Sequence, residues 1–387
     1  MTDYYLNKVA AICSLGKDLS AINRALFGGG PSPLTLSDQF SPGRPKPIGQ
    51  ISTPLESADT RNNALLLTAL APLREDIEAL KQSYGAQRIG VIIGSSTSGI
   101  AEGEQAVAEH EANGKMPSSF HYQQQEIGAP SQFVAQTLGV KGPAWTISTA
   151  CTSGAKALSS AARLLNSGVV DAVICGGADS LCRLTVEGFS SLSACSDKLC
   201  LPFSKNRDGI NIGEAAALFI MSRKPSAVRL RGYGETSDAH HISAPEPQGN
   251  GAVAAMELAL QRAGLKATDI GYINLHGTAT QQNDRMEALA VNRVFGQQTP
   301  CSSTKPLTGH TLGAAGALEA AFCWLALQNS QQQLPPHLWD SVYDNDIPEL
   351  QGLGQLTTQQ PLRYAISNSF AFGGNNAALI LEHCHAQ

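Results

Sequence analysis

The sequence predicts an α/β protein, because strand-like apolar runs alternate with helical patterns along the whole chain. Glycine is frequent, with 37 residues, while aromatic residues make up only 6% of the chain, which favours closely packed layers over a bulky aromatic core. With 387 residues and 42% hydrophobic content, the chain is long enough for two domains or for two similar halves joined into one.

Short apolar runs bounded by Gly, Pro or polar residues predict buried strands over residues 88–94, 144–148, 172–177, 215–221, 227–230, 272–275, 364–368 and 377–381. Between them, apolar residues at helical spacing predict helices over residues 64–79, 155–167, 251–263, 284–295 and 314–327. Residues 28–60 are rich in Gly, Pro and Ser and lack a period, which predicts a long surface loop, and residues 99–117 also read as irregular. The polar segment 221–226 contains Pro225 and is the predicted joint between an N-terminal half, 1–225, and a C-terminal half, 226–387.

Composition excludes several classes of function. A net charge of -5, with 27 Lys+Arg against 32 Asp+Glu, argues against a nucleic-acid surface. No apolar run reaches the length of a membrane span, and the first residues lack the features of a signal peptide, so we expect a cytoplasmic protein without a membrane span. The nine cysteines contain no Cys-x-x-Cys pair, so we expect neither disulfides nor a metal site, and no motif indicates a cofactor.

Cys151 is the candidate nucleophile. A strand-like run leads toward it, Ala150 and Gly154 leave space around the thiol, and helix formers follow from Ala155. A cysteine attacks a thioester as thiolate, and a helix N-terminus is one of the devices that favour this form. A buried cysteine that only packs at a helix start is the alternative interpretation.

Two histidines lie at the ends of predicted elements. His276 follows the strand 272–275, and His310 precedes an Ala- and Gly-rich helix. Two neutral imidazoles that offer N–H groups to a carbonyl oxygen would stabilise the enolate left when a malonyl group loses carbon dioxide. Taken alone, each histidine is more often a satisfied hydrogen-bonding residue, and only their combination with Cys151 favours catalysis.

Lys305 stands among small, uncharged residues, which predicts a buried lysine paired with Glu319. Such a pair would hold the charge balance that keeps His310 in the required tautomer. A solvated surface lysine is the alternative.

A glycine turn follows the predicted strand 364–368. Phe370 and Phe372 stand next to Gly373 and Gly374. Such a loop brings backbone N–H groups close to a ligand while an aromatic ring opens and closes above it. A plain glycine-rich turn would explain the glycines but not the paired rings.

Together these motifs resemble those of the β-ketoacyl-acyl carrier protein synthases, the type I/II condensing enzymes of the thiolase superfamily. Residues 149–154 resemble the nucleophile motif, 274–284 the first histidine motif, 303–319 the lysine and second histidine motif, and 368–376 the gating loop. The motifs occur in the family's order, and the likeness spans nearly the whole chain.

The resemblance implies a thiolase fold, a five-layered αβαβα sandwich of two similar halves. It implies a decarboxylative Claisen condensation of an acyl group on Cys151 with malonyl-ACP, in fatty acid or specialised polyene or polyketide biosynthesis. His276 and His310 would assist decarboxylation, the backbone N–H groups of Cys151 and Phe372 would form an oxyanion hole, and Phe372 would act as a gate.

The implied partners are acyl carrier protein, loaded with an acyl or malonyl group, and a second subunit. That subunit would be either an identical chain or a related condensing-enzyme subunit. We expect any basic docking patch for the carrier to include Arg61, Lys198, Lys205 or Arg207.

By the same resemblance, the substrate-binding positions are Phe370, Phe372, Gly373, Thr278, Thr280, Asp238 and His241, and Glu319 supports Lys305. The chain departs from the family pattern at Ala371, where glycine is usual, and at Ser204, where aspartate is common. Residues 28–64 match the family poorly and are shortened, which leaves the substrate class open.

Three relatives and one other class of protein compete with this interpretation. A chain-length factor, the non-catalytic partner of some condensing enzymes, would lack the active thiol, so Cys151 argues against it. A thiolase would need a second reactive cysteine where Phe372 lies, and a starter-type synthase pairs Cys and His with Asn where this chain has His310. A scaffold that only binds acyl carrier protein is the alternative from a different class.

Overall fold

A computed structural model describes residues 3–384, and ten of its strands form one continuous sheet. The sheet has the order β11-β10-β12-β13-β9-β1-β8-β6-β4-β5. The strands of the first part of the chain are β1 (Tyr4–Ile12), β4 (Ile89–Gly94), β5 (Ala144–Ile147), β6 (Ala172–Asp179) and β8 (Ala215–Ser222). Those of the second part are β9 (Val228–Ser237), β10 (Tyr272–Asn274), β11 (Cys301–Ser302), β12 (Tyr364–Ala371) and β13 (Asn375–His383).

The continuous sheet consists of two similar sheets. In the first part β5, β4 and β6 run parallel while β8 and β1 are antiparallel additions, and β11, β10, β12, β13 and β9 repeat that pattern in the second part. The two sheets meet at β1 and β9 through only two residue pairs, Tyr4 with Leu230 and Tyr5 with Arg229. This internal repeat agrees with the predicted fold of two similar halves.

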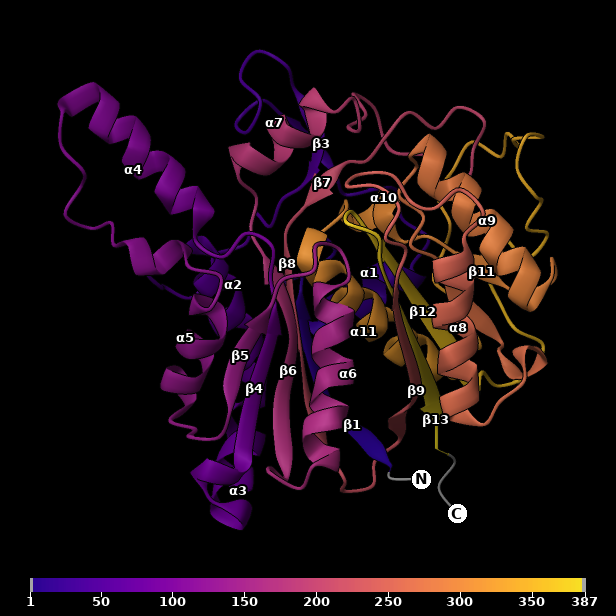
Figure 1. Ribbon diagram of the computed structural model, residues 1–387, viewed down its shortest axis with the longest axis horizontal. Coiled ribbons are helices and arrows are strands. Elements are labelled where there is room, and N and C mark those ends of the chain that lie inside the picture. The colour runs from indigo at the N-terminus through magenta and orange to yellow at the C-terminus, as the bar shows by residue number, and fades with distance from the viewer. Residues whose placement is uncertain (1–2, 385–387) are drawn as a thin grey trace.

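Helices form the other layers (Figure 1). The central layer consists of α6 (Ser153–Asn166) and α11 (Ala315–Leu327), which contact each other and strands of both sheets. The outer layers consist of α2 (Arg61–Leu70), α3 (Arg74–Tyr84) and α5 (Ala129–Leu138) on one side and α8 (Asn250–Ala263) and α9 (Gln281–Phe295) on the other. Twelve of the thirteen residues of α11 are buried, as expected for a helix enclosed on all sides.

Further helices, short strands and 3-10 segments connect these layers. They comprise α1 (Leu19–Phe27), α4 (Ile100–Asn113), α7 (Arg183–Ser191), α10 (Lys305–Thr308), a small sheet of β2 (Thr35–Ser37), β3 (Lys46–Gly49) and β7 (Ile212–Gly213), and the 3-10 segments η1 (Ala71–Leu73), η2 (Ala86–Arg88), η3 (Tyr122–Gln125), η4 (Ala267–Asp269) and η5 (Leu312–Ala314).

Two of the predicted elements need correction. The expectation that residues 99–117 are irregular is wrong, because α4 occupies most of them and projects from the body of the molecule (Figure 1). Only Gly103 and Ala106 of this helix are buried, so the apolar period that marks most helices is absent. The predicted helix 64–79 is divided into α2 and α3 by a 3-10 turn that contains Pro72, whose ring cannot continue a helix.

The predicted loop 28–60 is mostly irregular, although it also contributes β2 and β3. The predicted strands are all present, and several extend further than expected, such as β9 and β12. Among residues 3–384, no helix combines the length and the apolar character needed to cross a membrane.

Candidate active site

Cys151 lies in a sharp turn between β5 and α6. The preceding residue, Ala150, has a left-handed backbone with a φ of 52°. Ser153 closes this turn, because its Oγ accepts a hydrogen bond from Thr149 N at 2.9 Å and donates one to Ala150 O at 2.6 Å. The thiol is therefore presented at the N-terminus of α6, where the helix dipole favours negative charge.

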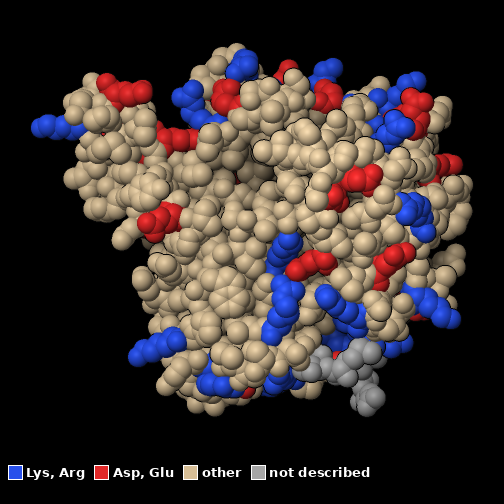
Figure 2. Space-filling view, in the orientation of Figure 1, with Lys and Arg blue, Asp and Glu red and all other residues tan. Residues whose placement is uncertain are grey.

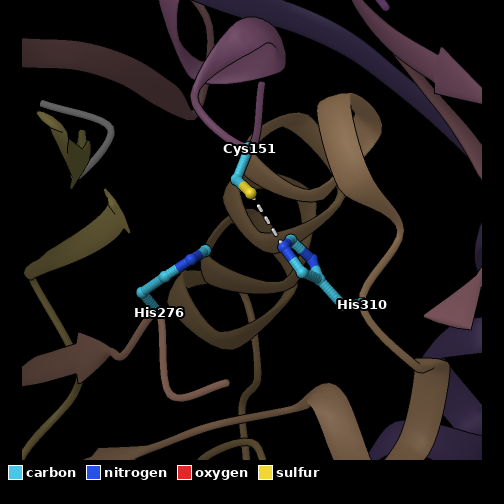
Figure 3. Close-up of side chains that lie close together, drawn as sticks. All are labelled: Cys151, His276 and His310. Carbon is cyan, nitrogen blue, oxygen red and sulfur yellow. Dashed lines mark hydrogen bonds between the residues drawn. The ribbon is translucent and has the colours of Figure 1, made fainter. Parts of the chain in front are cut away.

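Cys151 and the two histidines come together, as Figure 3 shows. The Sγ atom of Cys151 lies 2.9 Å from Nε2 of His310, and the His276 and His310 rings lie edge to face with centroids 5.3 Å apart. Cys151 belongs to the first part of the chain and both histidines to the second. The site therefore exists only where the two similar halves meet.

His276 is held mainly through its backbone. It follows β10, and the carboxylate of Glu287 on α9 accepts hydrogen bonds from the N–H groups of His276 and Gly277, both at 2.7 Å. Burial raises the pKa of Glu287 to about 8, although the same two N–H groups act in the opposite direction. Sequence reasoning missed Glu287, whose only signal was an acidic residue on the helix that follows the histidine motif.

Lys305 is buried and forms the expected ion pair, with Nζ 2.5 Å from Oε1 of Glu319. The same Nζ donates to the carbonyl oxygen of His276 and lies 3.4 Å from His276 Nδ1. Lys305 therefore contacts His276 directly, and it acts on His310 through its charge alone. Within the described part of the chain, Nδ1 of His310 has no hydrogen-bond partner.

Both imidazoles are uncharged. Burial lowers the pKa of His276 and of His310 well below the usual range, and the positive charge of Lys305 lowers both further. Neutral imidazoles keep an N–H group on one nitrogen and a lone pair on the other, so each ring offers both a donor and an acceptor.

The structure favours a protonated thiol at Cys151, whereas the helix N-terminus predicted a thiolate. Burial raises the pKa of Cys151 to about 12, although Lys305 and the backbone N–H groups of Cys151 and Phe372 act to lower it. Burial dominates because moving the thiolate out of water costs more free energy than its attraction to these N–H groups and to Lys305 provides. The resting site is therefore a neutral thiol hydrogen-bonded to a neutral imidazole.

A cavity of about 360 Å³ opens onto this site. Its lining includes the predicted residues Cys151, His276, His310, Thr278, Thr280, Asp238, Phe370 and Phe372. Two of the predicted substrate-binding residues lie outside the lining, as do Lys305 and Glu319. His241 is exposed and its Nδ1 accepts hydrogen bonds from the N–H groups of Ser243 and Ala244, while Gly373 forms the turn of the gating loop with a φ of 81°.

Phe189 on α7 was missed by sequence reasoning and had no motif to mark it. Its ring packs against that of Phe372 with centroids 5.4 Å apart, and both rings line the cavity. The proposed gate therefore rests against α7 in this structure.

Two members of the predicted basic docking patch form ion pairs within the chain. Arg61 forms an ion pair with the fully buried Glu214 at 2.5 Å, and Arg207 is itself buried and pairs with Asp344 at 2.5 Å. Lys198 and Lys205 are exposed. Burial makes Arg207 unavailable to a carrier protein, whereas Arg61, whose side chain is 32% exposed, and the two lysines are accessible.

The ligand atoms of Cys151, His276 and His310 lie within 4.8 Å of one another, a spacing that could hold a metal ion. A Cys-His-His set suits zinc with an open fourth position. The cationic Lys305, 3.4 Å from His276 Nδ1, opposes a second positive charge at this site. The donor set therefore fits nucleophilic chemistry better than metal binding.

Comparison with known proteins decides the family. Residues 47–227 match the model of the β-ketoacyl synthase N-terminal domain, and residues 227–339 match that of the C-terminal domain. The chain belongs to the β-ketoacyl synthase family. This membership confirms the predicted condensing function in fatty acid or polyketide biosynthesis and agrees with the thiolase fold.

The matches to similar proteins span most of this chain. A 3-oxoacyl-[acyl-carrier-protein] synthase 2 of Staphylococcus aureus strain COL is 34% identical over 321 residues, which are 78% of this chain and 76% of the relative. The enzyme of the same name from Rhizobium meliloti strain 1021 is 36% identical over 316 residues, 76% of this chain and 73% of the relative. A chain of the solved complex of the ketosynthase ApeO with its chain length factor ApeC, from Xenorhabdus doucetiae, matches with 43% identity and a TM-score of 0.95 over 99% of this chain and 98% of that one.

Proposed function

We propose that this β-ketoacyl synthase carries an acyl group on Cys151 and condenses it with malonyl-ACP to give β-ketoacyl-ACP. The observation that carries the proposal is the 2.9 Å contact between Cys151 Sγ and His310 Nε2, at a cavity that a second neutral imidazole also lines. A reactive cysteine next to a base is the arrangement that nucleophilic catalysis requires.

The first step is acyl transfer from the carrier to Cys151. Because the thiol is neutral at rest, Sγ attacks the thioester carbon as its proton passes to Nε2 of His310. The carrier's sulfur leaves and takes up that proton, which restores the neutral imidazole. The N–H groups of Cys151 and Phe372, which already lie close enough to the thiol to affect its pKa, stabilise the tetrahedral oxyanion.

The second step is decarboxylation of malonyl-ACP. Once Cys151 is acylated it no longer donates to His310, and the His310 tautomer that carries its proton on Nε2 can donate. N–H groups of His276 and His310 then donate to the thioester carbonyl oxygen, so that negative charge gathers there as the bond to the carboxylate breaks and carbon dioxide leaves. Lys305 and Glu319 contribute by holding His276 in place and by keeping the nearby charge balanced.

The third step forms the carbon–carbon bond. The enolate carbon attacks the acyl carbon on Cys151, and the tetrahedral intermediate expels the Cys151 sulfur as a thiolate. This thiolate takes up one proton from solvent, which balances the negative charge left by the departing carbon dioxide. Phe372 opens for each carrier-borne substrate and closes afterwards, with Thr278, Thr280 and Asp238 along the wall of the cavity.

We also propose a cytoplasmic location and a division of the chain into two units, residues 1–225 and 226–387. A second subunit would bind at the unit formed by residues 1–225. The complex of the Xenorhabdus ketosynthase with a chain length factor supports a related, rather than identical, partner. Strand β5 ends the sheet, and in Figure 2 the area over β4, β5 and α5 carries almost no charged residues. An unpaired sheet edge beside an uncharged area is typical of a subunit interface.

The decisive experiment is acylation of the purified chain by acyl-ACP, measured by mass spectrometry of the intact protein and its peptides. We expect one acyl group on the peptide that contains Cys151 and none on Cys151→Ala. Equal labelling of parent and Cys151→Ala would refute the assignment of the nucleophile. A folded parent that takes up no acyl group, alone or with a partner subunit, would favour the chain-length-factor-like alternative.

The role of His310 needs its own measurement. We expect His310→Ala to abolish release of carbon dioxide from malonyl-ACP while some acyl transfer to Cys151 remains. Parent-like release of carbon dioxide from this variant would remove His310 from the decarboxylation step.

A further inference from the structure

Asp179, the last residue of β6, is fully buried and accepts hydrogen bonds from two separate segments. Its Oδ1 atom accepts four of them from the loop after β4, donated by Ser95 Oγ at 2.7 Å, Ser96 N at 2.8 Å, and Thr97 N and Oγ1 at 2.9 Å each. Its Oδ2 atom accepts one from Gly313 N at 2.6 Å. Only this last donor belongs to the second part of the chain.

Gly313 closely follows His310, so this bond holds the segment that carries the catalytic imidazole. At the start of that segment, His310 N donates to Asn211 O at 2.6 Å, and Gly213 N donates to His310 O at 3.0 Å. At its end, the bond from Gly313 N to Asp179 is the anchor. Residues 310–313 are therefore tied to the first half of the molecule at both ends, by backbone at one end and by a carboxylate at the other.

The packing around Gly313 leaves this segment little room to move. A Cβ atom on Gly313 would lie 2.6 Å from Ser96 Oγ and 2.8 Å from Asp179 Oδ2. On the other side, a Cβ atom on Gly154, at the start of α6, would lie 2.9 Å from Gly313 O. The segment after His310 is thus pressed between Asp179 and the helix that follows the nucleophile.

We propose that Asp179 is a positioning residue that sets the hydrogen bond between Cys151 and His310 by anchoring residues 310–313 to the first half. The proposal deepens the proposed function and rests on it, since it concerns the proton transfer assigned to that bond. The two partners come from different halves, so a small shift of the segment lengthens the 2.9 Å contact directly. Misplacement of reacting groups by about 1 Å reduces rates by about 100-fold.

The chemistry of the site requires a carboxylate. Both oxygens of Asp179 face donors only, and an asparagine would replace one oxygen by an NH₂ group. In either orientation of that amide, a donor would face a donor. Asp179→Asn therefore keeps the volume of the side chain but replaces an attractive contact with a repulsive one on one side.

The test compares full-length Asp179→Asn with the parent in two assays per folded protein, acyl transfer from acyl-ACP and alkylation of Cys151 by iodoacetamide. We expect kcat for acyl transfer to fall by about 10- to 100-fold with an unchanged KM for acyl-ACP, because the mouth of the cavity is untouched. Alkylation of Cys151 should slow as well. Thr97→Val, which removes the hydroxyl donor to Oδ1, should give a smaller decrease in both assays.

Glu382→Gln is the matched control. This buried carboxylate contacts Arg229 and Arg363 near the end of β13 that is remote from the gating loop. We expect it to lower the thermal midpoint while leaving the kinetics of the folded fraction at parent values. The control therefore separates the effect of losing any buried carboxylate from the effect of losing Asp179.

If Asp179→Asn is less stable but keeps parent kcat and a parent alkylation rate, Asp179 is structural only and the proposal fails. If Asp179→Asn does not fold, acyl transfer is measured in Thr97→Val and Gly313→Ala instead. A kcat equal to that of the parent in both variants overturns the proposal. Failure of the proposed function looks different, because the parent itself would then carry no acyl group on Cys151.

Discussion

At the scale of single residues, the site contains a neutral pair and a charged pair side by side. Cys151 and His310 are both uncharged at rest, since burial raises the pKa of one and lowers that of the other. Lys305 and Glu319 are the charged pair, and Lys305 links it to His276. The charge that catalysis needs on sulfur therefore forms during the reaction rather than before it.

The first prediction concerns the pH dependence of Cys151. A thiol whose pKa is raised to about 12 is almost wholly protonated at neutral pH, and its thiolate fraction rises about tenfold per pH unit. The rate of alkylation by iodoacetamide should therefore increase steadily from pH 6 to pH 9 without a plateau. Mass spectrometry of the Cys151 peptide measures this rate. A plateau of the rate near neutral pH would show that the thiolate is present at rest.

The second prediction concerns the buried ion pair. Lys305→Met leaves Glu319 buried without its cation, which should lower the free energy of unfolding by about 3–5 kcal/mol. The double variant Lys305→Met with Glu319→Gln should recover part of that loss, because no charge is then left unpaired. Urea denaturation measures both.

The control for the ion pair is Lys8, whose contact with Asp76 at 3.0 Å is exposed on both sides. Lys8→Met should change the free energy of unfolding by less than about 1 kcal/mol. A loss as small as this in Lys305→Met would mean that Glu319 takes up a proton without cost.

At the scale of elements, the central helices α6 and α11 approach each other through glycine and alanine. Gly154 lies where a side chain would meet the backbone, since a Cβ atom there would lie 2.7 Å from Ala317 N. This close approach places the start of the nucleophile helix against the beginning of α11. Small residues at this contact therefore bring Cys151 and His310 within reach of each other.

The third prediction compares two glycines in helices. Gly154→Ala should destabilise the protein by about 1–3 kcal/mol and slow acyl transfer, because the backbone atoms that it meets cannot give way. Gly188→Ala on α7 meets no atom within 4 Å and should stabilise the protein by about 0.5–1 kcal/mol. Thermal unfolding and acyl-transfer rates of both variants check this, and equal shifts in the same direction would contradict it.

At the scale of the whole molecule, the two ends of the sheet differ. Beyond β11, Leu353 pairs with Cys301 and covers that edge. Strand β5 ends the other side, and Trp145 on it is 37% exposed. The uncharged area in Figure 2 adjoins this open edge, so association with a second subunit is expected there.

The fourth prediction tests that surface. Trp145→Glu places a charge at the edge of β5 and should weaken association with a second subunit by at least about tenfold, since a buried unpaired charge is costly. Sedimentation velocity measures the change. Leu36→Glu, at a residue 69% exposed on the separate small sheet, is the control and should associate like the parent. Equal association of both variants with the parent would place the interface elsewhere.

Prediction from the sequence succeeded where local pattern carries the information. The strands β4, β6 and β8 are buried apolar runs, and Ala150 and Gly309 mark left-handed turns next to Cys151 and His310. It failed for α4, which projects into solvent and has no apolar face to reveal it. It also failed for Glu287, which no motif marked, and for Asp179, whose partner Gly313 is distant in the sequence.

The sequence by itself determined the α/β class, the choice of Cys151, His276 and His310 as the proposed catalytic residues, and the family that their motifs resemble. Only the tertiary structure decided that Cys151 rests as a thiol, that Lys305 contacts His276 rather than His310, and that Arg61 and Arg207 are engaged internally. Charge state and partner choice depend on how much water is removed and on which distant segments meet. Both arise only when the two halves pack together.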